Sequence, residues 1–277
     1  MSAGAAAESD TRGRQVAMSE FTVRGKRVAV VGGAASGVAA ARLLVERGAE
    51  VTLTDLRPAL DAAADLASLG VSLALGSHPE GLLTGSDLVV VSPGVPADQP
   101  SVSAARAAGV PVIGEVELAS RWLRGRVVAI TGTKGKSTTT ALTGRMLEAA
   151  GVRVLVGGNI GTPLASHAAA STADTVHVVE VSSFQLETTD TFHPWIAALL
   201  NLTADHLDRH ASVEEYAAAK ARIFARQTER DIAVANADDA RALAMAGAGR
   251  ARVVRFARDA RIDAGVTVAD GWIVERG

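Results

Sequence analysis

The residues best able to do chemistry form a glycine- and lysine-rich run, G-T-K-G-K-S-T, at Gly132–Thr138. Glycines let backbone N–H groups face phosphate oxygens, and a helix opening at the run adds the positive end of its dipole. Lys136 can then reach the β- and γ-phosphates of a nucleotide, and the Ser137 hydroxyl can bind Mg²⁺. The full phosphate-loop pattern has glycine where Ile130 stands, so a capped turn without a ligand is the alternative. The strand expected before the run and the helix expected after it favour phosphate binding.

A second glycine-rich turn, G-G-A-A-S-G at Gly32–Gly37, follows the first apolar run of the chain. A dinucleotide-binding fingerprint has glycine where Ala34 stands, and Asp55 ends the next apolar run, about where a ribose-binding acid belongs. On these residues alone, nucleotide binding and a tight turn without a ligand are equally open.

Three further polar residues follow apolar runs or lie on an expected helix. Glu180 lies inside V-V-E-V, where a carboxylate needs an ion-pair partner or a metal. His206 lies in D-H-L-D after another apolar run and can face the same loop, where Mg²⁺ would need oxygen ligands and a phosphate. Lys220 lies in Y-A-A-A-K. Taken singly, Glu180 is equally explained by a buried salt bridge, and His206 and Lys220 are better explained as surface residues.

The elements that would position these residues alternate between strands and helices in two successive series. This alternation predicts βαβ units with parallel sheets, and therefore an α/β fold. The second series restarts near residues 114–126, where we place the domain boundary. Strands are expected at 26–31, 50–54, 71–75, 87–91, 127–130, 152–156, 176–181, 195–200, 232–235 and 253–256, with a hairpin at 266–274 around Asp270-Gly271. Helices are expected at 39–47, 60–69, 101–108, 115–123 and 213–226, and from the lysine-rich run to residue 150.

Composition narrows the class of protein. The 277 residues are 48% hydrophobic and carry a net charge of −2, so a disordered chain and a basic nucleic-acid-binding surface are excluded. Cysteine is absent, which excludes disulfides and thiolate chemistry and is compatible with the cytoplasm. Aromatic residues make up only 3%, so the core must consist mostly of Ala, Val and Leu. We expect residues 1–22 to form a disordered extension that is not a signal peptide, and we expect no membrane-spanning segment.

Taken together, the motifs resemble those of the Mur ligases, ATP-dependent enzymes that build the peptide stem of bacterial peptidoglycan. The block S-S-F-Q-L-E within 180–189 favours the branch of the family that adds D-glutamate. The matching blocks are A-I-T-G-T-K-G-K-S-T (129–138), G-G-N-I-G (157–161), E-V-S-S-F-Q-L-E-T-T (180–189), N-L-T-A-D-H-L-D-R-H (201–210), Y-A-A-A-K-A-R-I (216–223) and V-A-N-A-D-D (234–239), and S-P-G-V-P at 92–96 also fits.

The resemblance implies a Rossmann-like domain at 23–114 that holds the UDP part of the substrate, and a central ATP-binding domain of phosphate-loop type at 115–277. It implies that Lys136, His206 and Lys220 act in catalysis, Lys220 as a carbamylated lysine. The implied phosphate contacts are Gly132, Thr133, Lys134, Gly135, Lys136, Ser137 and Thr138, and the implied Mg²⁺ residues are Ser137, Glu180, His206 and Lys220. The implied substrate contacts are Ala35, Ser36, Asp55, Leu56, Arg57, Gly94, Asn159, Ser182, Ser183 and Gln185.

The implied reaction joins D-glutamate to UDP-N-acetylmuramoyl-L-alanine. The alanine carboxylate would attack the γ-phosphate of ATP, and the D-glutamate amine would displace phosphate from the acyl phosphate. A cytoplasmic monomer that binds neither nucleic acid nor membrane is expected.

Two departures from the family pattern stand out. Lys134 occupies a position where the family has asparagine, and the family's C-terminal domain, which binds D-glutamate, is missing, so we expect this chain alone to be inactive. The alternatives are another Mur ligase or a folylpolyglutamate synthase-like ligase, a phosphate-loop NTPase or kinase fused to a nucleotide-binding module, and a non-catalytic nucleotide-binding protein.

Overall fold

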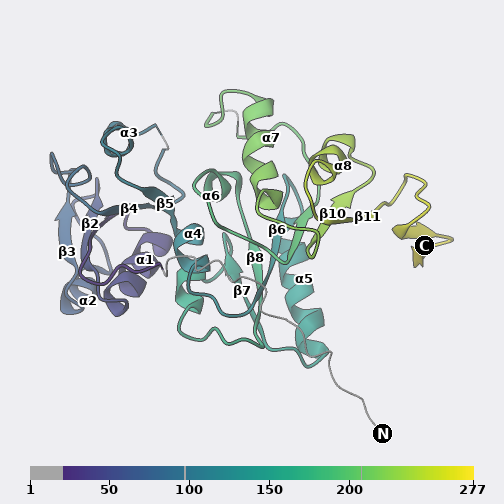
Figure 1. Cartoon of the computed structure of the whole chain (residues 1–277), viewed down its shortest axis with the longest axis horizontal. Helices are drawn as coiled ribbons and strands as arrows, with labels where there is room; N and C mark the ends of the chain where they lie inside the picture. Colours follow the sequence, from purple (N-terminus) through teal and green to yellow (C-terminus); the bar gives the residue numbers. More distant parts are fainter. Residues whose placement is uncertain (1–20, 97, 207) are drawn as a thin grey trace, which may run out of the picture.

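The computed structural model describes residues 21–96, 98–206 and 208–277, which form two α/β units in series (Figure 1). The first unit is built on a five-stranded parallel sheet with the strand order β3-β2-β1-β4-β5. Its strands are β1 (Arg27–Val31), β2 (Glu50–Asp55), β3 (Ser72–Leu75), β4 (Leu88–Val91) and β5 (Val112–Gly114), and its helices are α1 (Ala35–Glu46), α2 (Ala63–Ser68) and α3 (Pro100–Ala107).

The second unit is built on an eight-stranded sheet with the order β13-β12-β11-β10-β9-β6-β8-β7. All its pairs are parallel except β12–β13, the hairpin that projects at the C-terminal end in Figure 1. Its strands are β6 (Arg126–Thr131), β7 (Val154–Gly158), β8 (Val176–Glu180), β9 (Ile196–Leu199), β10 (Ile232–Asn236), β11 (Arg252–Phe256), β12 (Gly265–Ala269) and β13 (Trp272–Arg276). Its helices are α5 (Lys136–Ala149), η1 (Leu164–His167), α6 (Ser183–Glu187), α7 (Val213–Ala221), η2 (Arg222–Phe224) and α8 (Ala240–Gly247).

Each sheet has an apolar core on both faces, as parallel sheets require. In β1, Val28 and Val30 pack on the face beneath α1, while Ala29 and Val31 pack on the face beneath α3. The central strand β6 shows the same alternation, because Val127 and Ala129 belong to one core and Val128 and Ile130 to the other. These strands therefore read as continuous apolar runs, and the cores consist largely of Ala, Val and Leu, as expected from the low aromatic content.

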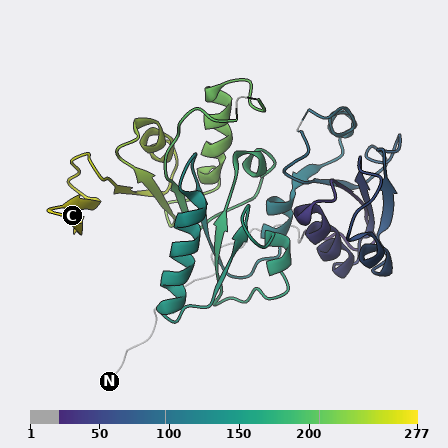
Figure 2. The same ribbon diagram turned by 180° about the vertical axis from the view of Figure 1, so that it is seen from behind.

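Helix α5 follows the lysine-rich run and covers one face of the second sheet, as seen in front in Figure 2. With 14 residues it is the longest of the described helices. No helix in the described part of the chain is long and apolar enough to cross a membrane.

A short helix, α4 (Glu115–Ser120), joins the two units and buries two carboxylates. Glu117 is fully buried, and its oxygens accept hydrogen bonds from the backbone N–H groups of Asp190, Thr191 and Phe192 at 2.8–3.1 Å. The side chain of Arg121 donates a further bond at 2.9 Å. These bonds tie the joint to the segment that follows α6, so the two units pack through shared polar and apolar contacts.

The α/β architecture predicted from the sequence is confirmed, and most strands begin and end within two residues of the predicted positions. The hairpin around Asp270-Gly271 is also confirmed. The helix predicted at 213–226 is shorter, since α7 gives way to the 3₁₀ turn η2. The elements β5, η1, α6 and α8 were not predicted. Of the predicted extension at 1–22, residues 1–20 lie outside the described residues, while the ring of Phe21 packs at 5.2 Å from Trp122.

Candidate active site

The lysine-rich run forms the loop between β6 and α5, and we call residues 132–138 the phosphate loop. Gly132 and Gly135 have φ values of +150° and +82°, which side chains other than glycine's adopt at a cost. A Cβ on Gly132 would lie 3.1 Å from the Cβ of Leu200, so the loop also runs close to the end of β9. Gly135 is the N-cap of α5, which places the first turn of that helix at the loop.

The side chain of Asn201 holds the first half of the phosphate loop. Its Oδ1 accepts hydrogen bonds from the backbone N–H groups of Thr133 (3.1 Å) and Lys134 (2.8 Å), and its Nδ2 donates to the carbonyl of Lys134 (3.0 Å). Two amides of the predicted phosphate contacts are therefore already bonded within the protein. Phosphate contacts by Thr133 and Lys134 remain a prediction, and the amides from Gly135 to Thr138 are better placed to face a phosphate, because the first turn of a helix has unbonded N–H groups.

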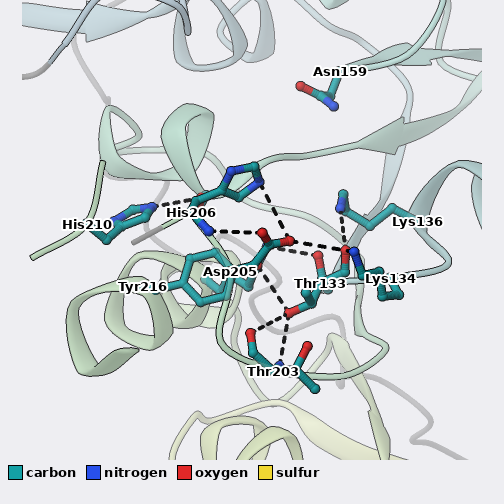
Figure 3. A network of polar contacts seen from close by, with 12 residues as sticks. Thr133, Lys134, Lys136, Asn159, Thr203, Asp205, His206, His210 and Tyr216 are labelled. Carbon is teal, nitrogen blue, oxygen red and sulfur yellow. Dashed lines mark hydrogen bonds and ion pairs between the residues drawn. The ribbon is translucent and has the colours of Figure 1, made fainter. Parts of the chain in front are cut away.

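Thr133 is buried, with 4% of its surface exposed, and its hydroxyl bonds several groups within the protein. Its hydroxyl donates to the carbonyl of Thr203 at 3.1 Å and accepts from the Thr203 N–H at 3.0 Å. The same hydroxyl lies 3.2 Å from the hydroxyl of Tyr216 on α7. Figure 3 shows these contacts beneath the loop. The loop is thus fixed by two elements that are distant in sequence.

The two lysines of the loop differ in their partners. The ammonium of Lys136 donates to the carbonyl of Thr133 at 3.0 Å, a neutral acceptor that a phosphate oxygen can replace. The side chain of Lys134 is 80% exposed and lies 4.0 Å from a carboxylate oxygen of Asp205. A charge at that position is therefore partly balanced by a neighbouring acid, and Lys134 lies in solvent.

Lys220 on α7 is buried, with 1% of its surface exposed, and its ammonium points at the root of the phosphate loop. It donates to the carbonyl of Gly132 at 2.9 Å and lies 3.3 Å from the Thr131 hydroxyl. Burial, reinforced by the nearby charge of Lys136, lowers the pKa of Lys220 to about 7. The buried position therefore favours the neutral amine of Lys220 far more than a surface position would.

Glu180 is the last residue of β8 and is 1% exposed. Its Oε1 accepts a hydrogen bond from the Asn159 side chain at 2.7 Å, while its Oε2 is buried with no hydrogen-bond partner. An unpartnered buried carboxylate oxygen fits a cation ligand. The described residues contain no group of three or more His, Asp or Glu side chains able to hold a metal, so a cation at Glu180 would need ligands from other groups, such as phosphate and water.

His206 lies on the far side of Asp205 from Lys134 (Figure 3). Its backbone has φ +52°, and its side chain is 47% exposed. Its Nε2 lies 3.9 Å from a carboxylate oxygen of Asp205, and its ring meets that of Phe184 edge-on with centroids 5.2 Å apart. The histidine is therefore available to solvent and to a ligand beside the phosphate loop.

A cavity of about 420 Å³ lies between the two units. It brings together most of the residues predicted to bind the substrate, whereas Leu56, Ser182 and Ser183 are not among its lining residues. The lining residues are Gly32, Ala34, Ala35, Ser36, Asp55, Arg57, Ser92, Pro93, Gly94 and Val95 from the first unit, and Gly158, Asn159, Gly161, Pro163 and Gln185 from the second. Because Asn159 also bonds Glu180, the cavity wall adjoins the end of β8.

Asp55 organises this cavity from the end of β2. One carboxylate oxygen accepts from the backbone N–H of Gly33 at 2.6 Å, and both accept from the guanidinium of Arg57 at 2.8–2.9 Å. These hydrogen bonds from Arg57, reinforced by the one from Gly33, hold the pKa of Asp55 well below its usual range although burial opposes them. Asp55 therefore fixes the loop after β1 and presents Arg57, whose side chain is 55% exposed, to the cavity.

The predicted contacts on α6 are largely occupied by structural bonds. Ser182 caps the helix by accepting from the Gln185 N–H at 3.3 Å, and the Gln185 side chain accepts from the Ser182 N–H at 2.9 Å. The hydroxyl of Ser183 bonds the Nε2 of His210 at 3.0 Å. Of these three predicted residues, Gln185 alone lines the cavity. The geometry thus gives Ser182 and Ser183 a supporting position instead of a place in the cavity wall.

Sequence reasoning missed four residues that build the site: Asn201, Thr203, His210 and Tyr216. All four lie in the blocks N-L-T-A-D-H-L-D-R-H and Y-A-A-A-K-A-R-I, which had been singled out as motifs. Their polar side chains offered a signal, but their partners are 27–83 residues away in the chain.

Two family models match the chain. Residues 26–114 match the N-terminal domain described as "Mur ligase MurD-like", and residues 130–270 match the "Mur ligase middle domain".

Curated relatives agree with these models. The chain is 47% identical over 257 residues to a UDP-N-acetylmuramoylalanine–D-glutamate ligase of Koribacter versatilis, covering 92% of this chain and 57% of the relative. It is 54% identical over 245 residues to the ligase of the same description from Anaeromyxobacter dehalogenans, covering 87% of this chain and 53% of the relative. The chain thus spans about half the length of the curated relatives it matches.

Solved structures share the fold. A Neisseria ligase described as UDP-N-acetylmuramate:L-alanyl-gamma-D-glutamyl-meso-diaminopimelate ligase superposes with a TM-score of 0.61 at 20% identity, over 91% of this chain and 84% of that one. A UDP-N-acetylmuramate-alanine ligase from Thermotoga maritima gives a TM-score of 0.52 at 24% identity, over 87% of this chain and 54% of that one.

Proposed function

This chain belongs to the Mur ligase family, and from that premise we propose that it carries the UDP-substrate-binding and ATP-binding parts of an ATP-dependent ligase. The proposed reaction adds D-glutamate to UDP-N-acetylmuramoyl-L-alanine in the synthesis of peptidoglycan precursors. The two relatives at 47% and 54% identity are named UDP-N-acetylmuramoylalanine–D-glutamate ligases, and the activity of the whole ligase is part of the proposal. The proposal places the reaction in the cytoplasm, where ATP is available, and takes the chain to be a monomer.

The observation that carries the proposal is the bond between Asn159 and Glu180. Asn159 lines the cavity between the two units. Glu180 is the last residue of β8, which pairs with β6, and the phosphate loop follows β6 in the chain. A UDP-linked substrate in the cavity would therefore direct its far end toward the phosphate loop. Transfer of a phosphoryl group to a carboxylate requires the two reactants in contact, and this arrangement supports such a contact.

In the proposed site, six residues of the first unit hold the UDP part of the substrate. They are Ala35, Ser36, Asp55, Leu56, Arg57 and Gly94. The diphosphate is anionic, and the guanidinium of Arg57 is the cation that the loop after β2 presents to the cavity. Asp55 acts through Arg57 by fixing its orientation. Asn159 and Gln185 continue the cavity toward the phosphate loop.

At the phosphate loop, the ammonium of Lys136 and the amides of the first turn of α5 would hold the phosphates of ATP. Their positive charges would stabilise negative charge that accumulates on the transferred group. Mg²⁺, held by Ser137, Glu180 and the phosphates with His206 nearby, would supply further neutralisation of that charge. A single charge-stabilising donor of this kind is worth about 10²–10³ in rate.

Lys220 is proposed to act as a carbamate. Its neutral amine would attack carbon dioxide, a C–N bond would form, and the proton released would pass to solvent, leaving an anion in place of a cation. Burial and the lowered pKa of Lys220 supply the neutral amine that this addition needs. The carbamate oxygens would then become available to a cation beside Glu180.

Calorimetric titration of this chain with UDP-N-acetylmuramoyl-L-alanine, and separately with ADP and Mg²⁺, tests the proposal. Saturable binding of both ligands is expected. Arg57→Ala should lower only the affinity for the UDP-linked substrate, and Lys136→Ala should lower only the affinity for ADP, because the two residues contact different ligands. Failure of the folded parent chain to bind the UDP-linked substrate would contradict the proposed function.

A further inference from the structure

A buried histidine that the proposed reaction does not use lies between α6 and α7. His210 is 3% exposed. Its Nε2 lies 3.0 Å from the hydroxyl of Ser183, and its Nδ1 lies 3.2 Å from a carboxylate oxygen of Glu187. Both polar atoms of the imidazole are thus occupied by residues of one short helix, which fixes the plane of the ring.

The order serine, histidine, glutamate is that of a nucleophilic triad. A nucleophilic serine must be open to its substrate, but Ser183 is 2% exposed, and it lies outside the cavity lining. The arrangement therefore holds the imidazole in place and does not activate the hydroxyl for attack.

The fixed imidazole in turn contacts two other rings. It stacks on Phe184 with centroids 5.3 Å apart and planes 8° from parallel, and it meets the ring of Tyr216 edge-on at 5.2 Å. Tyr216 is 1% exposed, so its ring has little room to move independently of His210. Figure 3 shows His210 and Tyr216 on the same side of the site.

Tyr216 connects this cluster to the phosphate loop. Its hydroxyl lies 3.2 Å from that of Thr133, and the ammonium of Lys220 lies 4.7 Å from the centre of its ring. At the other end of the cluster, Gln185 on α6 lines the cavity between the two units. The path from the cavity wall therefore follows the backbone of α6 from Gln185 to Glu187, and continues by side-chain contacts through His210 and Tyr216 to the phosphate loop.

We propose that His210 is a positioning residue that couples α6, and with it the cavity wall, to the phosphate loop through Tyr216. The inference rests on the proposed function in one respect, because the loop is taken to hold the phosphates of a nucleotide. The imidazole needs its ring for the contact with Tyr216 and its two nitrogens for the contacts with Ser183 and Glu187. Phenylalanine at 210 would keep the ring only, whereas glutamine would keep a polar group able to reach Ser183.

The chain contains one tyrosine, so a fluorotyrosine-labelled protein gives a single fluorine NMR signal that reports on Tyr216. Glu187→Gln keeps the shape of the side chain but removes the charge beside His210. Among the described residues, Glu187 contacts His210 and His210 contacts Tyr216, so the signal tests the path through His210. We expect the signal to move in Glu187→Gln and in Ser183→Ala. The matched control is Asp190→Asn, which removes an exposed carboxylate paired with Arg226, and it should leave the signal in place.

Affinity for ADP with Mg²⁺ supplies the second measurement. His210→Phe should weaken it about three- to tenfold, the usual size of an effect transmitted between packed elements, and His210→Gln should weaken it less. Unchanged affinity in folded His210→Phe, or a fluorine signal indifferent to Glu187→Gln, would overturn the coupling. If the parent chain itself fails to bind ADP, the assignment of the phosphate loop is wrong, and the fluorine comparison still decides the role of His210.

Discussion

Two glycine-rich loops in this molecule follow the same plan, each linking a central strand to a helix, but they are held by opposite means. The loop after β1 is fixed by a charged group, because the carboxylate of Asp55 bonds the Gly33 N–H and the guanidinium of Arg57. The loop after β6 is fixed chiefly by neutral groups, the amide of Asn201 and the hydroxyl of Thr133. Among the described residues no carboxylate accepts a hydrogen bond from it, while the buried amine of Lys220 bonds the Gly132 carbonyl at its root.

The difference follows from what each loop has to present. An acid at the end of β2 orients a neighbouring arginine toward the cavity while balancing its charge. A neutral amide beneath the phosphate loop adds no negative charge next to an anionic ligand, and it leaves the ammonium of Lys136 on a carbonyl oxygen. Acid should therefore lower the stability that the first loop contributes, and it should leave the contribution of the second loop unchanged.

The largest expected effect comes from the cation of the phosphate loop. Lys136→Ala should lower the affinity for ATP about 10–100-fold, since charge-assisted hydrogen bonds contribute roughly 1.5–3 kcal/mol. Lys134→Ala is the matched control, because that side chain is 80% exposed and its positive charge is partly balanced by the carboxylate of Asp205. It should change the affinity for ATP by less than about threefold. Titration calorimetry gives both values. Equal losses in the two variants would show that charge in the loop matters more than position.

Removal of the neutral clamp should cost stability as well as binding. In Asn201→Ala the N–H of Lys134 loses its acceptor, whereas the N–H of Thr133 keeps the backbone carbonyl of Asn201 at 3.0 Å, and the free energy of unfolding should fall by about 1–3 kcal/mol. Urea denaturation measures the change. ATP affinity should fall in the same variant, while affinity for the UDP-linked substrate stays the same. A variant as stable as the parent would mean that water replaces the amide.

The two regions should also differ in their response to pH. The folded pKa of Lys220, about 7, lies below that of an exposed lysine, so between pH 7 and about 10.4 the unfolded chain binds more protons. Stability should therefore rise with pH across this window in the parent, and Lys220→Met should remove that rise. Denaturation midpoints at intervals from pH 7 to 10 provide the measurement. A parallel pH profile in the two proteins would rule out a buried amine.

At the other loop the window is acidic and the effect is smaller. Arg57 and Gly33 depress the folded pKa of Asp55, so its contribution is present above the unfolded pKa of about 3.9 and is lost as pH falls below it. Asp55→Asn should lower stability at neutral pH by a modest amount, because Arg57 is half exposed, and the difference from the parent should shrink toward pH 3. Thermal unfolding from pH 3 to pH 7 follows the difference, and a constant difference would contradict the charged clamp.

The sequence was sufficient to predict the framework, because strands buried on both faces read as apolar runs and polar motifs at their carboxyl ends meet at one edge of a parallel sheet. It also contained a signal that was not used, since S-x-x-Q at 182–185 is a capping-box pattern. Read in that way, Ser182 would have been predicted as a helix cap. The burial of Lys220 and the contacts of Asn201 and His210 were beyond prediction, because they depend on which distant segments pack together.

The central claim is that the cavity and the phosphate loop serve two reactants of one reaction. A crystal structure of this chain with UDP-N-acetylmuramoyl-L-alanine and ADP with Mg²⁺ tests it most directly. The account predicts the diphosphate of the UDP group beside Arg57 and Ser36, the ADP phosphates at Gly135–Thr138, and the alanine carboxylate near Asn159 and Glu180, facing the phosphate loop. A UDP-linked substrate bound outside the cavity, or one whose carboxylate points away from the phosphate loop, would contradict the account.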